Sequence, residues 1–251
     1  MEGIIYVAHG TRLKQGVEEA KLFVSELNNH LPIQIQEIAF LEFQTPTMED
    51  ACEQLIQKGV TTIYLFPLLL FAAGHAKDDI PKIIAKVQRK YPHITIYNMG
   101  VLGVSAELAQ IVANRVKVNH LDNRETEWIL IGRGSKDPYA YRDFLKMKEK
   151  IAKRLQVNLT VSFLAAHPIR VEEAVRQAKK EGKRQIVLIP YLLFSGRLMK
   201  RLEKLQREEQ SSKCMITLCP SIGYHRHFAT LFQKRLEEKR EEIFLFQTFI
   251  S

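Results

Sequence analysis

The sequence is poor in cysteine and has no apolar run of the roughly 20 residues that a bilayer span needs. Its three cysteines, Cys52, Cys214 and Cys219, are unevenly spaced and form no CxxC pair. This spacing argues against a disulfide framework, a zinc knuckle and an iron–sulfur cluster. The first residues, MEGIIYVAHG, lack the basic segment of a signal peptide. We therefore expect a cytoplasmic protein that is not inserted in a membrane.

Common phosphate-binding and nucleophile motifs are also missing. Neither GxGxxG nor GxxxxGK[ST] occurs, so no glycine loop for a nucleotide phosphate is indicated. The absence of GxSxG removes the nucleophile elbow of the α/β-hydrolases. The formal charge of +9 favours an acidic partner, either nucleic acid, an anionic membrane or a polycarboxylate small molecule. Because stacking motifs and a concentrated basic stripe are lacking, we expect no nucleic-acid partner.

Strand-like and helix-like segments alternate along the chain. The apolar run IYLFPLLLF, at the centre of the first half, suits a strand buried on both faces of a sheet. It is the third of four predicted strands, which cover residues 3–8, 34–41, 62–70 and 94–99. Segments with helical spacing of apolar residues separate these strands. Such alternation indicates a parallel α/β sheet.

The second half repeats the first in register. IVLIPYLLF corresponds to IYLFPLLLF and has its proline at the same place, and WILIGRGSK corresponds to IIYVAHGTR. FLAAHP answers FLEFQTP, one residue shorter. We therefore predict two similar flavodoxin-like α/β domains, each with a four-stranded parallel sheet, at residues 1–120 and 121–251. The apolar segment 243–250 is expected to pack on one of the domains.

Three side chains that can bind a metal ion follow three strands of the first half. His9 comes after the first strand, Glu42 after the second and His75 after the third. If the strand order is 2-1-3-4, these strand ends are neighbours at one edge of the sheet. Two imidazole nitrogens and one carboxylate oxygen suit iron, cobalt or nickel, with coordination positions left open for a substrate.

The equivalent positions of the second half carry Arg133, Ala165 and Arg197, so the metal-binding side chains are absent there. A single histidine after a strand is more often a loop residue bonded to backbone groups, and a single glutamate is more often a solvated acid. Joint placement in one half and joint replacement in the other favour a metal site over this alternative. His225 and His227 either flank the site or begin a helix, and the helix start is favoured.

Three segments carry a resemblance to a known family. VAHGTR, FLEFQTPT and FPLLLFAAGHAKDDIP resemble the class II chelatases of tetrapyrrole synthesis, the CbiX/SirB group, over nearly the whole chain. The resemblance implies a lyase that inserts Fe²⁺ into sirohydrochlorin to give siroheme and two protons. Cobalt insertion for cobalamin synthesis and a non-catalytic carrier of tetrapyrrole or metal are the alternatives. The His-rich segment and cysteine motif of long cobaltochelatases are absent, which favours iron.

The resemblance also implies roles for particular residues. His9, His75 and Glu42 would be catalytic and would bind the metal, with one of the two histidines as the base. We expect no cofactor beyond the metal substrate, which is Fe²⁺, with Co²⁺ or Ni²⁺ also compatible.

Four further residues are predicted to bind the substrate, which carries many carboxylates. Arg133 and Arg197 are assigned this role because they replace the histidines. Arg12 and Gln44, in the loops that hold His9 and Glu42, complete the set. We expect the protein to act as a monomer.

Overall fold

The computed structural model describes residues 1–72, 74–116 and 124–250, except the side chains of His75, Gln247, Phe249 and Ile250. These residues form two compact units. The first unit contains Met1–Gly103 and Tyr224–Ser251, and the second contains Val104–Gly223. No helix in the described part of the chain is both long enough and apolar enough for a membrane span.

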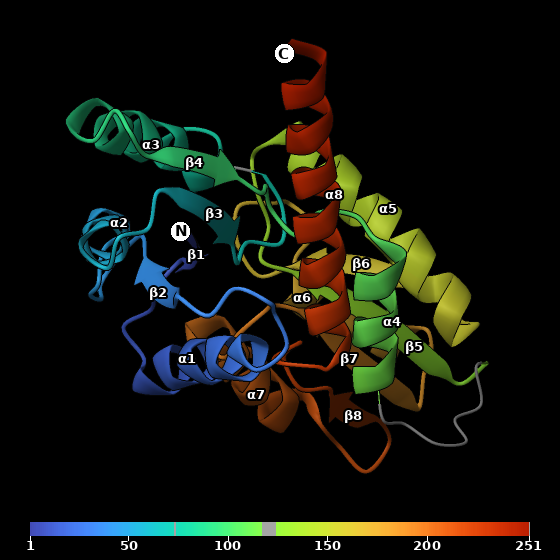
Figure 1. The fold of residues 1–251 in the computed structure, drawn as a ribbon. Coiled ribbons are helices and arrows are strands. Elements are labelled where there is room, and N and C mark those ends of the chain that lie inside the picture. Colours follow the sequence, from blue (N-terminus) through green and yellow to red (C-terminus); the bar gives the residue numbers. More distant parts are fainter. Residues whose placement is uncertain (73, 117–123, 251) are drawn as a thin grey trace. The chain divides into compact units, whose positions relative to one another are not determined.

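The first unit is built on a four-stranded parallel sheet with the order β2-β1-β3-β4 (Figure 1). Its strands are β1 (Glu2–Ala8), β2 (Gln36–Phe40), β3 (Thr62–Pro67) and β4 (Thr95–Asn98). The helices between them are α1 (Lys14–Asn28), α2 (Met48–Gln57), the short 3₁₀ helix η1 (Gly74–Ala76) and α3 (Asp79–Lys90). The strand order that the metal-site prediction needed is therefore confirmed.

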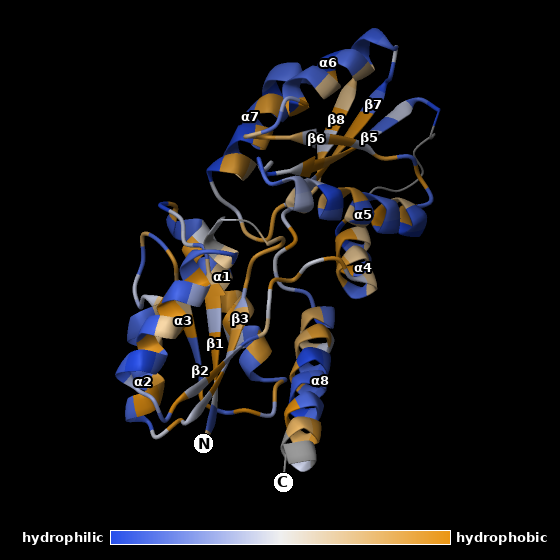
Figure 2. Cartoon of the chain, turned by 90° about the horizontal axis from the view of Figure 1, so that it is seen from above, coloured by the Kyte–Doolittle hydropathy of each residue, from blue (hydrophilic) through white to orange (hydrophobic). Residues whose placement is uncertain are grey.

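The second unit repeats this sheet in the order β6-β5-β7-β8. Its strands are β5 (Thr126–Gly132), β6 (Thr160–Phe163), β7 (Gln185–Tyr191) and β8 (Met215–Leu218). Its intervening helices are α5 (Pro138–Leu155), α6 (Val171–Lys180) and α7 (Arg197–Glu209). Figure 2 shows apolar strands flanked by helices with polar outer faces, as expected for sheets covered on both sides. The predicted pair of similar α/β folds is confirmed.

The last helix of each half packs in the other unit. Helix α4 (Ala106–Arg115) follows β4 but belongs to the second unit, where Arg154 of α5 donates a hydrogen bond to Gln110. Helix α8 (His227–Ile250) follows β8 but belongs to the first unit. There the ring of Phe232 lies 4.8 Å from that of Phe66 and 5.8 Å from that of Tyr6. The spatial units therefore differ from the expected division into 1–120 and 121–251, because α4 packs against α5 and α8 packs its aromatic side chains on the first sheet.

An arginine of each exchanged helix binds the segment through which the chain leaves the sheet. Arg235 on α8 donates to the carbonyl oxygens of Val101 (2.8 Å) and Leu102 (2.6 Å). Arg115 on α4 donates to the carbonyl oxygen of Ile222 at 2.7 Å. Arg115 and Arg235 lie at the same sequence distance from Gly103 and Gly223, so the duplication extends to this contact.

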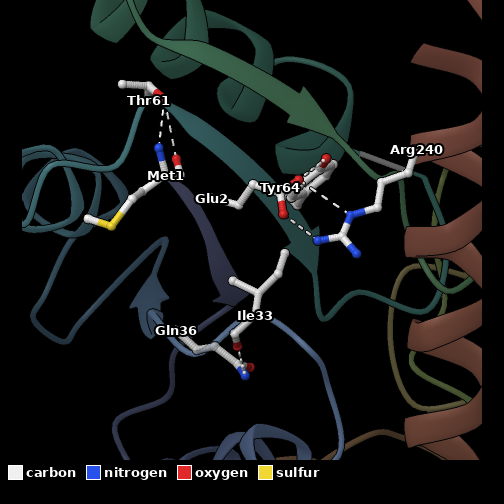
Figure 3. A network of polar contacts seen from close by, with 7 residues as sticks. All are labelled: Met1, Glu2, Ile33, Gln36, Thr61, Tyr64 and Arg240. Atoms are coloured by element: carbon white, nitrogen blue, oxygen red, sulfur yellow. Dashed lines mark hydrogen bonds and ion pairs between the residues drawn. The ribbon is translucent and has the colours of Figure 1, made fainter. Parts of the chain in front are cut away.

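The carboxyl-terminal half of α8 contacts the amino end of β1 through a polar network (Figure 3). Arg240 forms an ion pair with Glu2, which also accepts a hydrogen bond from the Tyr64 hydroxyl at 2.7 Å. Burial alone would raise the pKa of Glu2, but the hydrogen bonds from Tyr64 and Arg240 lower it below its usual value. Burial and the Glu2 carboxylate raise the pKa of Tyr64 to about 12.

Two features differ from the sequence-based expectation. Strand β3 ends at Pro67 instead of residue 70, because its ladder with β1 stops at Val7 and Pro67; beyond it, the carbonyl oxygens of Leu69 and Leu70 accept hydrogen bonds from Leu102 and Gly103. The apolar end of α8 does not pack as predicted: Phe244 and Phe246 are both 68% exposed. The buried residues of this helix lie nearer its start, since Phe228 and Phe232 supply its apolar face.

Candidate functional site

His9 and Glu42 are neighbours at the carboxyl edge of the first sheet. His9 is the first residue after β1, and its carbonyl oxygen accepts a hydrogen bond from the Glu42 backbone N–H at 3.0 Å. Gly10 makes this approach possible. Its φ is +89°, and a Cβ atom there would lie 1.9 Å from the Glu42 carbonyl oxygen. Two of the three predicted metal ligands are thus brought together by backbone contacts.

The ring of His9 is oriented by its own loop. Its Nδ1 atom lies 3.3 Å from the Gly10 carbonyl oxygen, which can only accept a hydrogen bond. Nδ1 therefore carries the proton in this contact, and Nε2 is the basic nitrogen. Histidine ligands of metal ions commonly donate their other N–H to a backbone carbonyl in this way. This geometry suits His9 as a ligand through Nε2.

His75 belongs to the third loop of the same edge, in η1 after β3. Its side chain lies outside the described residues, so its convergence on His9 and Glu42 stays a prediction. In the parts of the chain that the structure describes, no three His, Cys, Asp or Glu side chains are grouped to hold a metal ion. The predicted ligand set depends on His75 for its third member.

Gln44 joins the loops that carry His9 and Glu42. Its Oε1 atom accepts a hydrogen bond from the Thr11 N–H at 2.9 Å, and its Nε2 atom donates to the Thr11 carbonyl oxygen at 2.6 Å. These bonds give Gln44 a role in holding the site together. Its predicted contact with the substrate is a further role that stays a prediction.

Phe43 and Arg12 form an exposed pair beside the two candidate ligands. The Arg12 guanidinium carbon lies 4.9 Å from the centroid of the Phe43 ring, and the Phe43 side chain is 54% exposed. Sequence reasoning selected Arg12 but missed Phe43. The only signal available was an aromatic residue next to a candidate ligand in FLEFQTP, where it reads as part of the apolar pattern.

The predicted arginines occupy the equivalent places of the second unit. Arg133 follows β5, and its carbonyl oxygen accepts a hydrogen bond from the Ala165 N–H at 2.8 Å. Arg197 is the first residue of α7. Both side chains are exposed. A cation in the first turn of a helix opposes the helix dipole, so Arg197 is not there to stabilise α7.

The remaining histidines near the strand ends have structural contacts. The ring of His167 stacks on Tyr141 at a centroid distance of 4.8 Å, and burial lowers the pKa of His167 below its usual value. His225 accepts a hydrogen bond from the His227 N–H at 3.3 Å where α8 begins. The favoured interpretation of this pair as a helix start is confirmed.

Comparison with known proteins identifies close relatives. A family model described as CbiX matches residues 3–119 and again residues 127–239, which confirms the duplication. The chain is 32% identical over 239 residues to the sirohydrochlorin ferrochelatase of Priestia megaterium, covering 94% of this chain and 90% of that protein. Identity to the sirohydrochlorin cobaltochelatase of the same organism is 29% over 249 residues, covering 96% and 81%.

A solved structure shares the fold over almost its full length. SirB from Bacillus subtilis with Fe³⁺ is 33% identical to this chain and superposes with a TM-score of 0.83. The match covers 94% of each chain. It therefore includes both sheets and both halves of the repeat.

Proposed function

Since this chain belongs to the CbiX family, we propose that it is a sirohydrochlorin ferrochelatase, which inserts Fe²⁺ into sirohydrochlorin and releases two protons. The product is siroheme. The observation that carries the proposal is the backbone contact between His9 and Glu42 at the carboxyl edge of the first sheet. Ligands of open α/β sheets bind at this edge. The chain as a whole shares its fold with SirB from Bacillus subtilis with Fe³⁺.

The site suits a metal ion that must be both positioned and released. His9 through Nε2, the Glu42 carboxylate and His75 would hold the ion and leave coordination positions open for the pyrrole nitrogens. Two pyrrole N–H protons have to leave as the metal enters. An imidazole titrates near neutral pH and can accept such a proton, so His9 or His75 acts as the base.

Positive side chains bind the substrate. Sirohydrochlorin carries many carboxylates, and Arg12, Arg133 and Arg197 are exposed cations next to the strand ends of their own units. Guanidinium groups bind carboxylates with two parallel hydrogen bonds, which fixes orientation as well as position. Gln44 contributes the scaffold of the His9 loop and a further polar contact.

Cobalt insertion is the second candidate, because 29% identity links this chain to a cobaltochelatase. The ferrochelatase has the higher identity, 32% against 29%, and is matched over more of its own length, 90% against 81%, which favours iron. The reaction needs no cofactor beyond the metal substrate. Cys52, Cys214 and Cys219 are free and buried, which supports a reducing cytoplasm as its location. The monomeric state stays a prediction.

Anaerobic absorbance spectroscopy of sirohydrochlorin with Fe²⁺, and then with Co²⁺, tests the proposal. We expect rapid insertion by the wild type and a fall of about 100-fold or more in His9→Ala and in His75→Ala. His93→Ala is the matched control, since His93 is an exposed histidine before β4, at the opposite edge of the same sheet. Full activity in both site variants contradicts the assigned site. Binding of sirohydrochlorin with no rate above the uncatalysed control indicates the carrier.

A further inference from the structure

The backbone at Phe43 is strained. The Gln44 N–H donates to the Glu42 carbonyl oxygen at 2.9 Å, which closes a three-residue turn around Phe43. The φ of Phe43 is +67°. A turn of this kind with positive φ at its centre is rare and strained, and a bulky side chain there adds to the strain.

The surroundings hold this turn in place from both sides. The Gln44 amide binds the backbone of Thr11, and the Phe40 N–H donates to the Pro46 carbonyl oxygen at 3.0 Å. Gly10 lies against the Glu42 carbonyl oxygen. Strain that the neighbouring structure enforces in this way is characteristic of functional sites.

Packing in the core does not explain why residue 43 is a phenylalanine. More than half of the Phe43 side chain is exposed, so its ring contributes little to the core. The equivalent residue of the second unit is Ala166, with a φ of +49°. A methyl group is therefore sufficient at this position for a backbone with positive φ. The large ring at Phe43 needs a reason other than folding.

The chemistry of the pair indicates what it would contact. Phe43 offers a flat apolar face, and Arg12 stacks over its ring while keeping a guanidinium for an anion. A conjugated macrocycle with carboxylates on its rim presents the complementary features, a flat π face next to negative groups. Nucleic-acid bases, which are also flat π systems, bind to proteins by stacking on aromatic side chains in this way.

We propose that Phe43 positions the substrate: its ring packs on one face of the tetrapyrrole while Arg12 binds a carboxylate at the rim. Because Phe43 follows Glu42 directly, this contact places the pyrrole nitrogens beside the metal ligands. The inference rests on the proposed function, which supplies the tetrapyrrole. Phe43 itself transfers no proton and binds no metal.

Titration of metal-free sirohydrochlorin, followed by its absorbance, tests the contact apart from catalysis. Phe43→Gly is the decisive variant, because glycine relieves the positive φ and removes the ring. We expect its Kd to be about tenfold higher than that of the wild type, with an unchanged or higher Tm. Phe43→Tyr keeps the flat ring and is expected to keep the wild-type Kd. In the full reaction, Phe43→Gly should raise KM more than it lowers kcat.

Phe246→Ala is the matched control for loss of an exposed aromatic ring. Phe246 is 68% exposed and lies beyond Arg240, which binds the opposite edge of the same sheet at Glu2. Its Kd should equal that of the wild type. A wild-type Kd in Phe43→Gly overturns the inference, and so does a lower Tm, since the ring would then serve the fold. Binding without metal insertion by the wild type would refute the proposed function and leave the Phe43 contact standing.

Discussion

The loops after β2 and β6 are closed by the same backbone contacts and carry different side chains. Against each loop lies a glycine with positive φ from the loop after the neighbouring strand: a Cβ at Gly10, after β1, would be 1.9 Å from the Glu42 carbonyl oxygen, and one at Gly134, after β5, would be 1.8 Å from the Ala165 carbonyl oxygen. A parallel bridge closes each loop, Phe40 with Thr47 in the first and Phe163 with Arg170 in the second. The duplication has thus kept the geometry of the strand ends.

The side chains of the two loops differ in their chemistry. The first loop carries a carboxylate and a strained, exposed phenyl ring at Glu42 and Phe43, where the second carries two alanines. In the second loop the Leu164 carbonyl oxygen is bound by two arginines, Arg170 and Arg201, each at 2.7 Å. The scaffold is common to both halves, and the predicted metal ligands occur in only one of them.

The largest effect is expected from removing the carboxylate that distinguishes the loops. Glu42→Ala makes the first loop resemble the second, and the rate of iron insertion should fall about 100-fold or more because a metal ligand is lost. Glu42 is half-exposed, so its removal should change the unfolding free energy by no more than about 0.5 kcal/mol. The double variant with Ala165→Glu should stay inactive in the absorbance assay. Recovery of activity there would show that the halves are functionally equivalent.

The shared backbone is tested by substituting the two glycines. Gly10→Ala and Gly134→Ala should each lower the unfolding free energy by about 2 kcal/mol or more, because the new methyl group meets a backbone carbonyl at positive φ. Gly182→Ala is the control. Its φ is +78° with open space around it, so only the conformational cost of about 1–2 kcal/mol applies. The unfolding free energy is measured by denaturant unfolding. A loss in only one of the two variants would show that the two loops do not depend on the same backbone contact.

The smallest expected effect is a change in the pH dependence of stability through His167, whose ring stacks on Tyr141. Burial lowers its pKa in the folded state, so the folded protein binds this proton less readily than the unfolded chain does. The stability that His167 contributes is present above the unfolded pKa of about 6.5 and is lost as the pH falls. The advantage of the wild type over His167→Gln in unfolding free energy should therefore shrink towards about pH 5. An NMR titration that gives His167 a pKa above its usual value would contradict this.

The fold could be predicted from the sequence because its signals are local and repeated. Apolar runs marked the strands, and in-register matches such as IYLFPLLLF with IVLIPYLLF marked the duplication. The placement of His9 and Glu42 followed from strand order alone. The backbone of His75, the third predicted ligand, likewise follows a strand of this sheet, since η1 comes after β3.

Other features depend on contacts that no local pattern encodes. Apolar spacing in α4 and α8 shows which face of the helix is buried, but it does not show which of two similar sheets covers that face. The same holds for the end of β3, which is set by how far its ladder with β1 extends. The positive φ of Phe43 could not be predicted from the sequence, because the residues that commonly indicate this conformation are glycine and asparagine.

The return of α8 to the first sheet has a consequence for protein synthesis. Tyr6 and Phe66 are made early, whereas Phe232, which covers them, leaves the ribosome only after the whole second unit has been made. The second unit is one continuous stretch of chain and can close its core before the first. The usual order in which the amino-terminal part folds first is thus reversed, and one apolar face of the nascent first sheet must stay soluble until the second unit and helix α8 have been made.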